Sequence, residues 1–241
     1  MVGEQCRIKN QGGRMRKIIF CVLAFFFFPS LLLFAQEEEV VLTITTPQAE
    51  YDAETGKIVA QVSTFTWQDV KVVCPFLEID TQTQEARSEG NISISWGDFQ
   101  AQARALYYQG KENRLNFLGI EGSNPEIRFS TGEAFFDFNQ KRLCLTSSPL
   151  LVLQDWEVRA QNIEYSLEEK AWEAHIVRVE REDWQGRAEK ALYREGEEFI
   201  TLEGEAEVQG DSNLLRGEKI FVYLDSGRVR VEGNVEIKLV P

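Results

Sequence analysis

The amino-acid sequence predicts an all-β protein built from about seven two-strand repeats. Three observations predict it. A pair of apolar positions recurs every 28 or 29 residues, each repeat holds a stretch of alternating apolar and polar residues, and two turn signals punctuate each repeat. Repetition this regular predicts one supersecondary unit stacked along the chain.

The recurring pair consists of a small or apolar residue, one spacer, and a Tyr or another large apolar residue. The seven pairs are Ala49 and Tyr51, Leu77 and Ile79, Ala105 and Tyr107, Ala134 and Phe136, Ile163 and Tyr165, Ala191 and Tyr193, and Ile220 and Val222. They cover nearly all of the chain after residue 48. The repeat therefore predicts the architecture of the whole mature protein.

The first element along the chain is different in kind. Residues 14–17 include three basic residues, and a mainly apolar run, Ile18–Phe34, follows and ends at Ala35 before an acidic stretch. This pattern is typical of a secretory signal cleaved after Ala35, with Met15 as the expected true start. The run is near the short limit for a membrane span, so an uncleaved inner-membrane anchor stays open. The expected organisation is a signal peptide over 1–35 and one β domain over 36–241.

Within each repeat, a strand follows the recurring pair. The alternating positions are Ile58, Ala60 and Val62; Ala86, Ser88 and Gly90; Leu115, Phe117 and Gly119; Leu143, Leu145 and Ser147; Trp172, Ala174 and Ile176; Ile200, Leu202 and Gly204; and Val229, Val231 and Gly233. A period of two predicts strands with one apolar face. The glycines at the third position indicate bulges or close packing.

Two turn signals per repeat imply two strands per repeat, hence about fourteen strands of up to about eleven residues. The alternation slips after Val62 and after Ile176, where we expect β-bulges that add twist. No linker rich in Pro, Gly or Ser interrupts the repeats, which predicts a single domain.

Composition excludes several functions. The formal net charge is −13, and the basic residues before position 18 lie outside the predicted domain, so the domain itself is still more acidic. This balance argues against binding nucleic acid or an anionic membrane surface. The single histidine, His175, cannot build a metal cluster or a Ser/His/Asp triad, and no Gly-rich phosphate loop is present.

The remaining chemical candidates have simple structural interpretations. Acidic pairs such as Glu203 and Glu205 alternate along a strand, which is typical of a solvated face, although acid–base catalysis by carboxylates stays a minor alternative. Cys74 and Cys144 either pair in an oxidising compartment or stay as two separately buried thiols. We expect no cofactor, no metal and no enzymatic activity.

The C-terminal repeats resemble a known family. The segment Arg187–Tyr193 with Leu202–Gly204, and the segment Arg216–Val222 followed by Asp225–Ile237, show the small-x-Tyr, turn and Glu-Gly pattern of the OstA-like family. The resemblance is strong over residues 187–240 and weakens toward the N-terminus. It implies a long open antiparallel β-jellyroll whose apolar interior shelters the acyl chains of lipopolysaccharide in the periplasm.

The resemblance also implies a site and partners. The candidate groove residues are Ile92, Ile94, Trp96, Phe117, Leu143, Leu145, Ile200, Leu202, Val208, Val229, Val231, Val235 and Ile237. The implied partners are lipopolysaccharide or a related lipid, other jellyroll proteins of a transport bridge (LptC-like and LptD-like), and further copies of the chain joined head to tail. The family performs no bond chemistry, so no catalytic residue is implied.

A structural alternative also stays open from the residues alone. The same apolar faces would fill a sealed core. In that case the chain would be a secreted structural β-solenoid, or a filament or adhesin-like subunit with a dry core.

Overall fold

The structure is a computed structural model that describes residues 43–182, 184–210 and 213–239, and every regular element in these residues is a β-strand. The strands are β1 (Thr43–Thr45), β2 (Gln48–Asp52), β3 (Lys57–Trp67), β4 (Val70–Asp80), β5 (Glu85–Trp96), β6 (Phe99–Gln109), β7 (Arg114–Ser123), β8 (Ile127–Asp137), β9 (Arg142–Leu145), β10 (Leu150–Leu153), β11 (Trp156–Arg159), β12 (Asn162–Ser166), β13 (Ala171–Arg181), β14 (Trp184–Arg194), β15 (Phe199–Gln209), β16 (Asn213–Tyr223), β17 (Val229–Glu232) and β18 (Glu236–Leu239). The predicted all-β fold is confirmed. The predicted signal peptide lies outside the described residues.

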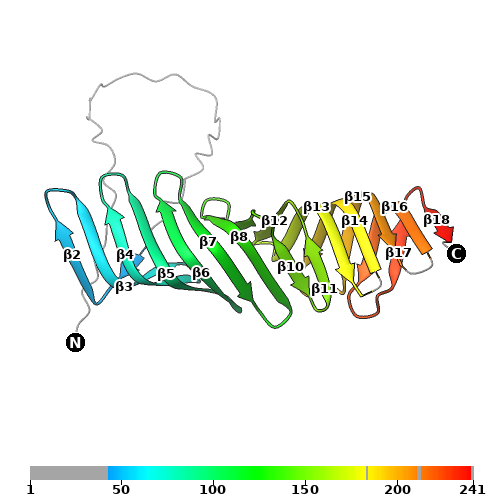
Figure 1. Ribbon diagram of the computed structural model, residues 1–241, viewed down its shortest axis with the longest axis horizontal. Helices are drawn as coiled ribbons and strands as arrows, with labels where there is room; N and C mark the ends of the chain where they lie inside the picture. Colours follow the sequence, from blue (N-terminus) through cyan, green and yellow to red (C-terminus); the bar gives the residue numbers. More distant parts are fainter. Residues whose placement is uncertain (1–42, 183, 211–212, 240–241) are drawn as a thin grey trace, which may run out of the picture.

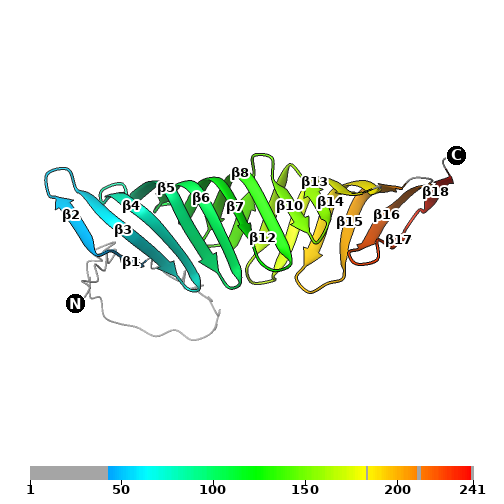
Figure 2. The same cartoon turned by 60° about the horizontal axis from the view of Figure 1, so that its bottom comes forward.

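The eighteen strands form one antiparallel meander of fourteen passes, because four passes are each interrupted once. The interrupted passes are β1 with β2, β9 with β10, β11 with β12, and β17 with β18. Each pass pairs with the next along the chain, so two passes fill one 28-residue repeat as predicted. The result is elongated, with β2 at one end and β18 at the other (Figures 1 and 2).

One backbone feature recurs in the middle of every second pass. A residue with positive φ stands there in each repeat: Val62, Gly90, Gly119, Ser148, Ile176, Gly204 and Gly233. The left-handed conformation reverses which side chains face inward, so each long pass contributes to two half-sheets that meet along this line. We call this row of seven residues the fold line. The recurring glycines predicted from the sequence belong to it, since glycine reaches positive φ at no steric cost.

The slips at Val62 and Ile176 are real, but their interpretation as β-bulges is wrong. Gln61 faces Phe76 and Ser63 faces Cys74, so the ladder keeps its register across Val62. The ladder of β13 with β14 also keeps its register across Ile176. A single left-handed residue reverses the alternation there without inserting an extra residue. Register shifts occur elsewhere, as in β15 between Glu203 and Ala206.

The third repeat places its aromatic residue differently from the prediction. Tyr107 is exposed, whereas Leu106 and Tyr108 face the core. The inward residues Phe117 and Leu115 pair with Leu106 and Tyr108, which fixes the face. Two adjacent tyrosines fit the sequence pattern equally well, so only the cross-strand partners distinguish them.

The interior is one continuous cluster of buried apolar side chains contributed by both half-sheets. Cys74 and Cys144 are both buried and free, so the two cysteines are separate thiols. Burial raises the pKa of each thiol to about 11. Such thiols are inert at neutral pH.

Candidate functional site

The predicted groove residues lie on the inner face, but they differ in burial. Nine are buried: Ile92, Ile94, Trp96, Phe117, Leu143, Leu145, Ile200, Leu202 and Val208. Val229 and Val231 are partly buried against the cluster. Val235 and Ile237 are 51% and 63% exposed. The sequence therefore identified inner-face residues, and the structure shows that the face passes from a packed core to solvent near the C-terminal end.

Cross-strand registers show that the inner face is continuous in both half-sheets, because directly opposed residues share one face. In the first half-sheet, Leu202 faces Ile220 and Ile220 faces Val231. In the second, Val208 faces Leu215 and Leu215 faces Ile237. The exposed Ile237 thus extends the same row as the fully buried Val208.

Each half-sheet ends in a row of turns, which we call rims. The first rim comprises the turns β2–β3, β4–β5, β6–β7, β8–β9, β12–β13, β14–β15 and β16–β17, and the second rim comprises the turns β3–β4, β5–β6, β7–β8, β10–β11, β13–β14 and β15–β16. The fold line lies between the two rims along each pass. Wherever the two rims meet, the interior is closed along its long side.

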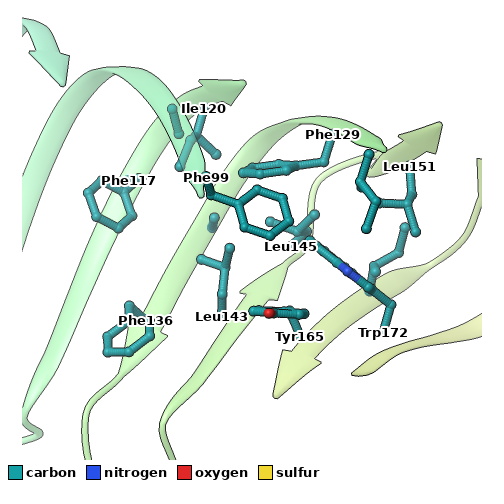
Figure 3. Packing of buried hydrophobic residues seen from close by; sticks show 14 of the residues in the cluster. Phe99, Phe117, Ile120, Phe129, Phe136, Leu143, Leu145, Leu151, Tyr165 and Trp172 are labelled. Carbon is teal, nitrogen blue, oxygen red and sulfur yellow. The ribbon is translucent and has the colours of Figure 1, made fainter. Parts of the chain in front are cut away.

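Aromatic side chains near the ends of the strands join the two rims. Trp67 of the second rim contacts Phe138, beside the first rim, with ring centroids 4.9 Å apart. Phe99 of the second rim lies 5.7 Å from Tyr165 and 6.0 Å from Trp172, which lie on either side of a first-rim turn. Figure 3 shows Phe99, Phe129, Tyr165 and Trp172 packed together. We call these cross-rim contacts the aromatic seam.

The interior is almost completely filled. One wholly apolar cavity of about 20 Å³ lies between the half-sheets, and Ile94, Trp96, Phe117 and Leu143 are among its lining residues. This is roughly the space that one water molecule occupies. A single acyl chain needs many times more, so the half-sheets must move apart before this cavity can hold one.

A second hollow, of about 220 Å³, lies between the rims toward the C-terminal end, and its lining is partly polar and partly apolar. Its lining includes the carboxylates of Glu126, Glu197 and Asp225, together with Gln154 and Tyr193. Burial raises the pKa of the Tyr193 hydroxyl. Carboxylates on both sides make this hollow unfavourable for an anionic group.

The sequence did not predict the seam or the hollow. Both join residues far apart in the chain, such as Trp67 and Phe138. The available signal was the recurrence of aromatic residues next to turns, at Trp96, Phe99 and Trp172. That signal marks the rims but does not say which turns meet.

The structure gathers no catalytic arrangement among the described residues. His175 is half-exposed, and its Nε2 lies 3.1 Å from a carboxylate oxygen of Glu173 on the outer face. Glu203 also faces outward and pairs with Lys219 at 2.6 Å. No group of three or more His, Cys, Asp or Glu residues within the described ranges is placed to bind a metal ion. Nor does that part of the chain contain a helix of the length and apolarity that crossing a membrane requires.

Comparisons with known proteins find a matching family and a similar solved structure. The LptD_N family, described as LptA/(LptD N-terminal domain) LPS transport protein, matches residues 72–228. Among solved structures, LptH, the LptA homologous periplasmic component of the lipopolysaccharide transport device of Pseudomonas aeruginosa, is 14% identical. The match covers 49% of this chain and 98% of that chain, with a TM-score of 0.40. A search of curated proteins finds no match.

The family match spans well over half of the chain and covers the repeats in which the sequence pattern was weak as well as those in which it was strong. The described activity of the family is transport, which confirms the expectation of a protein that is not an enzyme. The predicted resemblance to OstA-like proteins is confirmed on the same ground. This chain belongs to the family of LptA and LptD N-terminal-domain lipopolysaccharide transport proteins.

Proposed function

We propose that this chain carries lipopolysaccharide or a related acylated lipid through the periplasm, with the acyl chains on the inner face and the head group outside. Membership of a transport family supports the class of function. One structural observation carries the proposal. The inner face is apolar in every repeat and continues beyond the packed core to solvent at Val235 and Ile237.

A lipid moving along this interior would meet apolar side chains from the core to the last strand. The row from Val208 through Leu215 to Ile237 provides that path in the second half-sheet. The row from Leu202 through Ile220 to Val231 provides it in the first. Transfer of hydrocarbon from water to such a face is favourable at about 25 cal/mol per Å².

The finer role that we propose is a bridge between the inner and outer membranes. Within the described residues, β18 pairs only with β16, and β2 pairs only with β3, so each end has a free strand edge. Strand addition between such edges would join the chain head to tail with a second jellyroll, either its own copy or an LptC-like or LptD-like partner. In this proposal residues 1–35 are the secretory signal and 36–241 form the periplasmic domain.

The test compares neighbouring residues on opposite faces. A photo-crosslinking amino acid at Val231 or Ile237 is expected to capture lipopolysaccharide from cells, because both residues face inward and are not fully buried. The matched controls are Arg230 and Lys238, which directly adjoin them and face outward. Equal capture at all four positions, or capture at none, would contradict the proposal.

A second function is favoured by the filled interior. The cavity of about 20 Å³ is what a dry core shows, and a structural or adhesin-like β-solenoid needs nothing more. Organic extraction of the protein purified from its native periplasm, followed by mass spectrometry, separates the two functions. Stoichiometric acylated lipid supports transport, whereas its absence together with failed crosslinking at Val231 supports the structural function.

A further inference from the structure

All five tryptophans of the chain lie at strand ends, beside the rims. Trp67 and Trp96 are the last residues of β3 and β5, Trp156 and Trp184 are the first residues of β11 and β14, and Trp172 is the second residue of β13. Four therefore adjoin the second rim and one adjoins the first. Tryptophan prefers boundaries at which one end of the ring is apolar and the other meets polar groups.

Three of these five tryptophans share an unusual feature. The indole N–H groups of Trp96, Trp156 and Trp172 are buried and have no hydrogen-bond acceptor among the described residues. An indole nitrogen can only donate. Buried donors are nearly always paired, so three unpaired donors of one type on one inner face require an explanation. Trp67 and Trp184 do not share the feature.

Two of the unpaired donors stand on opposite rims within one aromatic cluster. Trp96 stacks on Phe99 with centroids 5.0 Å apart, and Phe99 contacts Trp172 at 6.0 Å. Phe129 lies 6.0 Å from Trp96 and 5.9 Å from Trp172. Trp96 also lines the apolar cavity between the half-sheets. In Figure 3 the Trp172 side chain, with its nitrogen in blue, lies among apolar side chains that include Phe99 and Phe129.

An acylated lipid carries the complementary groups. Its ester and amide carbonyl oxygens are acceptors, and they sit where the hydrocarbon tails join the polar head group. If the acyl chains occupy the interior and the head group stays outside, these oxygens lie at the rims. The unpaired indole N–H groups and the lipid carbonyl oxygens, which have lost their hydrogen bonds to water, would then meet at the rims.

We propose that the indole N–H groups of Trp96, Trp156 and Trp172 form a subsite that donates hydrogen bonds to the carbonyl oxygens of the bound lipid's acyl chains. This inference rests on the proposed function and adds the recognition of the acyl linkage to it. The apolar interior selects hydrocarbon, and the three indoles select chains that end in a carbonyl group.

The subsite becomes accessible when the rims separate. Across the seam the rims are joined through aromatic side chains and through a hydrogen bond from Arg181 to the carbonyl oxygen of Leu224. Along the fold line, by contrast, the backbone is continuous. Lipid entering between the rims would bring its carbonyl groups past Trp96 and Trp172 last, after its hydrocarbon has entered.

The direct test uses the indole resonances of the intact domain. In ¹H–¹⁵N spectra, titration with purified lipid A is expected to move the Nε1–H protons of Trp96, Trp156 and Trp172 downfield, which is the signature of new hydrogen bonds. The resonances of Trp67 and Trp184 are internal controls and should move less. Lipid A that binds while all five resonances respond alike would overturn the subsite but leave the transport function standing.

Substitution provides the second readout. Replacing Trp96 and Trp172 together by Phe keeps an aromatic ring and removes two donors, so the affinity for lipid A should fall about tenfold. Binding of N-phenyl-1-naphthylamine, an apolar probe that lacks a carbonyl, should stay unchanged. Trp184→Phe should change neither. Equal loss for both probes would show a packing defect and overturn the subsite, and no lipid A binding by the wild type would overturn the transport function itself.

Discussion

At the scale of single residues, the fold line depends on left-handed conformations that its non-glycine members adopt at a cost. Val62 has φ of 47° and Ile176 has φ of 51°. Both are β-branched, and such residues are rare outliers in the left-handed region. The repeat imposes this conformation even where glycine, which occupies the equivalent positions 90, 119, 204 and 233, is missing.

Replacing Val62 by Gly should therefore differ in its effect on stability from the same change at Val59, three residues earlier in the strand. Glycine relieves about 1–2 kcal/mol of left-handed strain and costs about 0.5–1 kcal/mol in chain entropy, so Val62→Gly should leave stability unchanged or raise it slightly. Val59 in the same strand is also exposed, at 47% against 57% for Val62, but has ordinary strand geometry. Val59→Gly should cost about 1 kcal/mol. Urea unfolding measures both, and equal destabilisation would contradict the strain argument.

The recurring aromatic residue is expected to be a core residue where the structure buries it. Tyr193 is buried and pairs with Trp172 across the β13–β14 ladder. Tyr193→Ala should lower the free energy of unfolding by about 3–5 kcal/mol. Glu205→Ala, an exposed change, should cost well under about 1 kcal/mol. A neutral Tyr193→Ala in thermal unfolding would mean that its burial contributes nothing.

At the scale of elements, the first and last passes of the sheet are the most exposed. β17 is partly buried, whereas every residue of β18 is exposed. Only β16 pairs with β18 among the described strands. An edge of this kind offers unpaired N–H and C=O groups to another strand. Its charges are mutually neutralised, since Glu236 contacts Arg216 at 3.3 Å and Lys238 at 3.1 Å.

Adjacent proline substitutions should separate folding from association. Neighbouring residues of a strand direct their N–H groups to opposite sides of the strand. One of the two substitutions Glu236→Pro and Ile237→Pro therefore removes a hydrogen-bond donor to β16, and the other removes a donor at the free edge. The edge variant should keep the thermal midpoint of the wild type and lose concentration-dependent oligomers in sedimentation. Two variants that associate like the wild type would contradict pairing through β18.

At the scale of the whole molecule, ion pairs cover the outer face and make stability depend on pH. Burial alone would raise the pKa of Glu207, but hydrogen bonds from Arg216 at 2.6 Å and Arg187 at 3.2 Å outweigh it and hold the pKa below its usual range. A carboxylate with a lowered folded-state pKa stabilises the protein above its unfolded pKa of about 4.3. That contribution disappears as the pH falls through the folded-state value.

We expect the wild type to lose more stability than Glu207→Gln between pH 5 and pH 3. The comparison matters because protonation also lowers the overall charge repulsion of a chain with a net charge of −13, and this effect is common to both proteins. Thermal midpoints measured across this range should converge toward acid pH. A constant difference between the two proteins would show that Glu207 titrates alike in the folded and unfolded states.

The sequence predicted the passes of the sheet because each is encoded locally. The period of 28 residues and the two turns per repeat are enough to place β13 to β16, and the alternation around Leu202 and Val231 places their inward side chains. The reversal at Val62 and the face of Tyr107 depend on backbone conformation and on cross-strand partners, so their local patterns were misleading. The seam depends on how far the sheet twists, which no single repeat specifies.

The long sequence separation between residues that meet in the seam also affects the order of folding. Each ladder joins a pass to the one directly before it, so it can form as soon as one further strand is available. The seam contact of Trp67 instead requires Phe138, which lies more than 70 residues later in the chain. Closing so long a loop costs more entropy than closing a hairpin. A chain synthesised from its N-terminus would thus pair its strands into a sheet before the two rims meet. The apolar face of that sheet would stay exposed to solvent while about two and a half further repeats are synthesised.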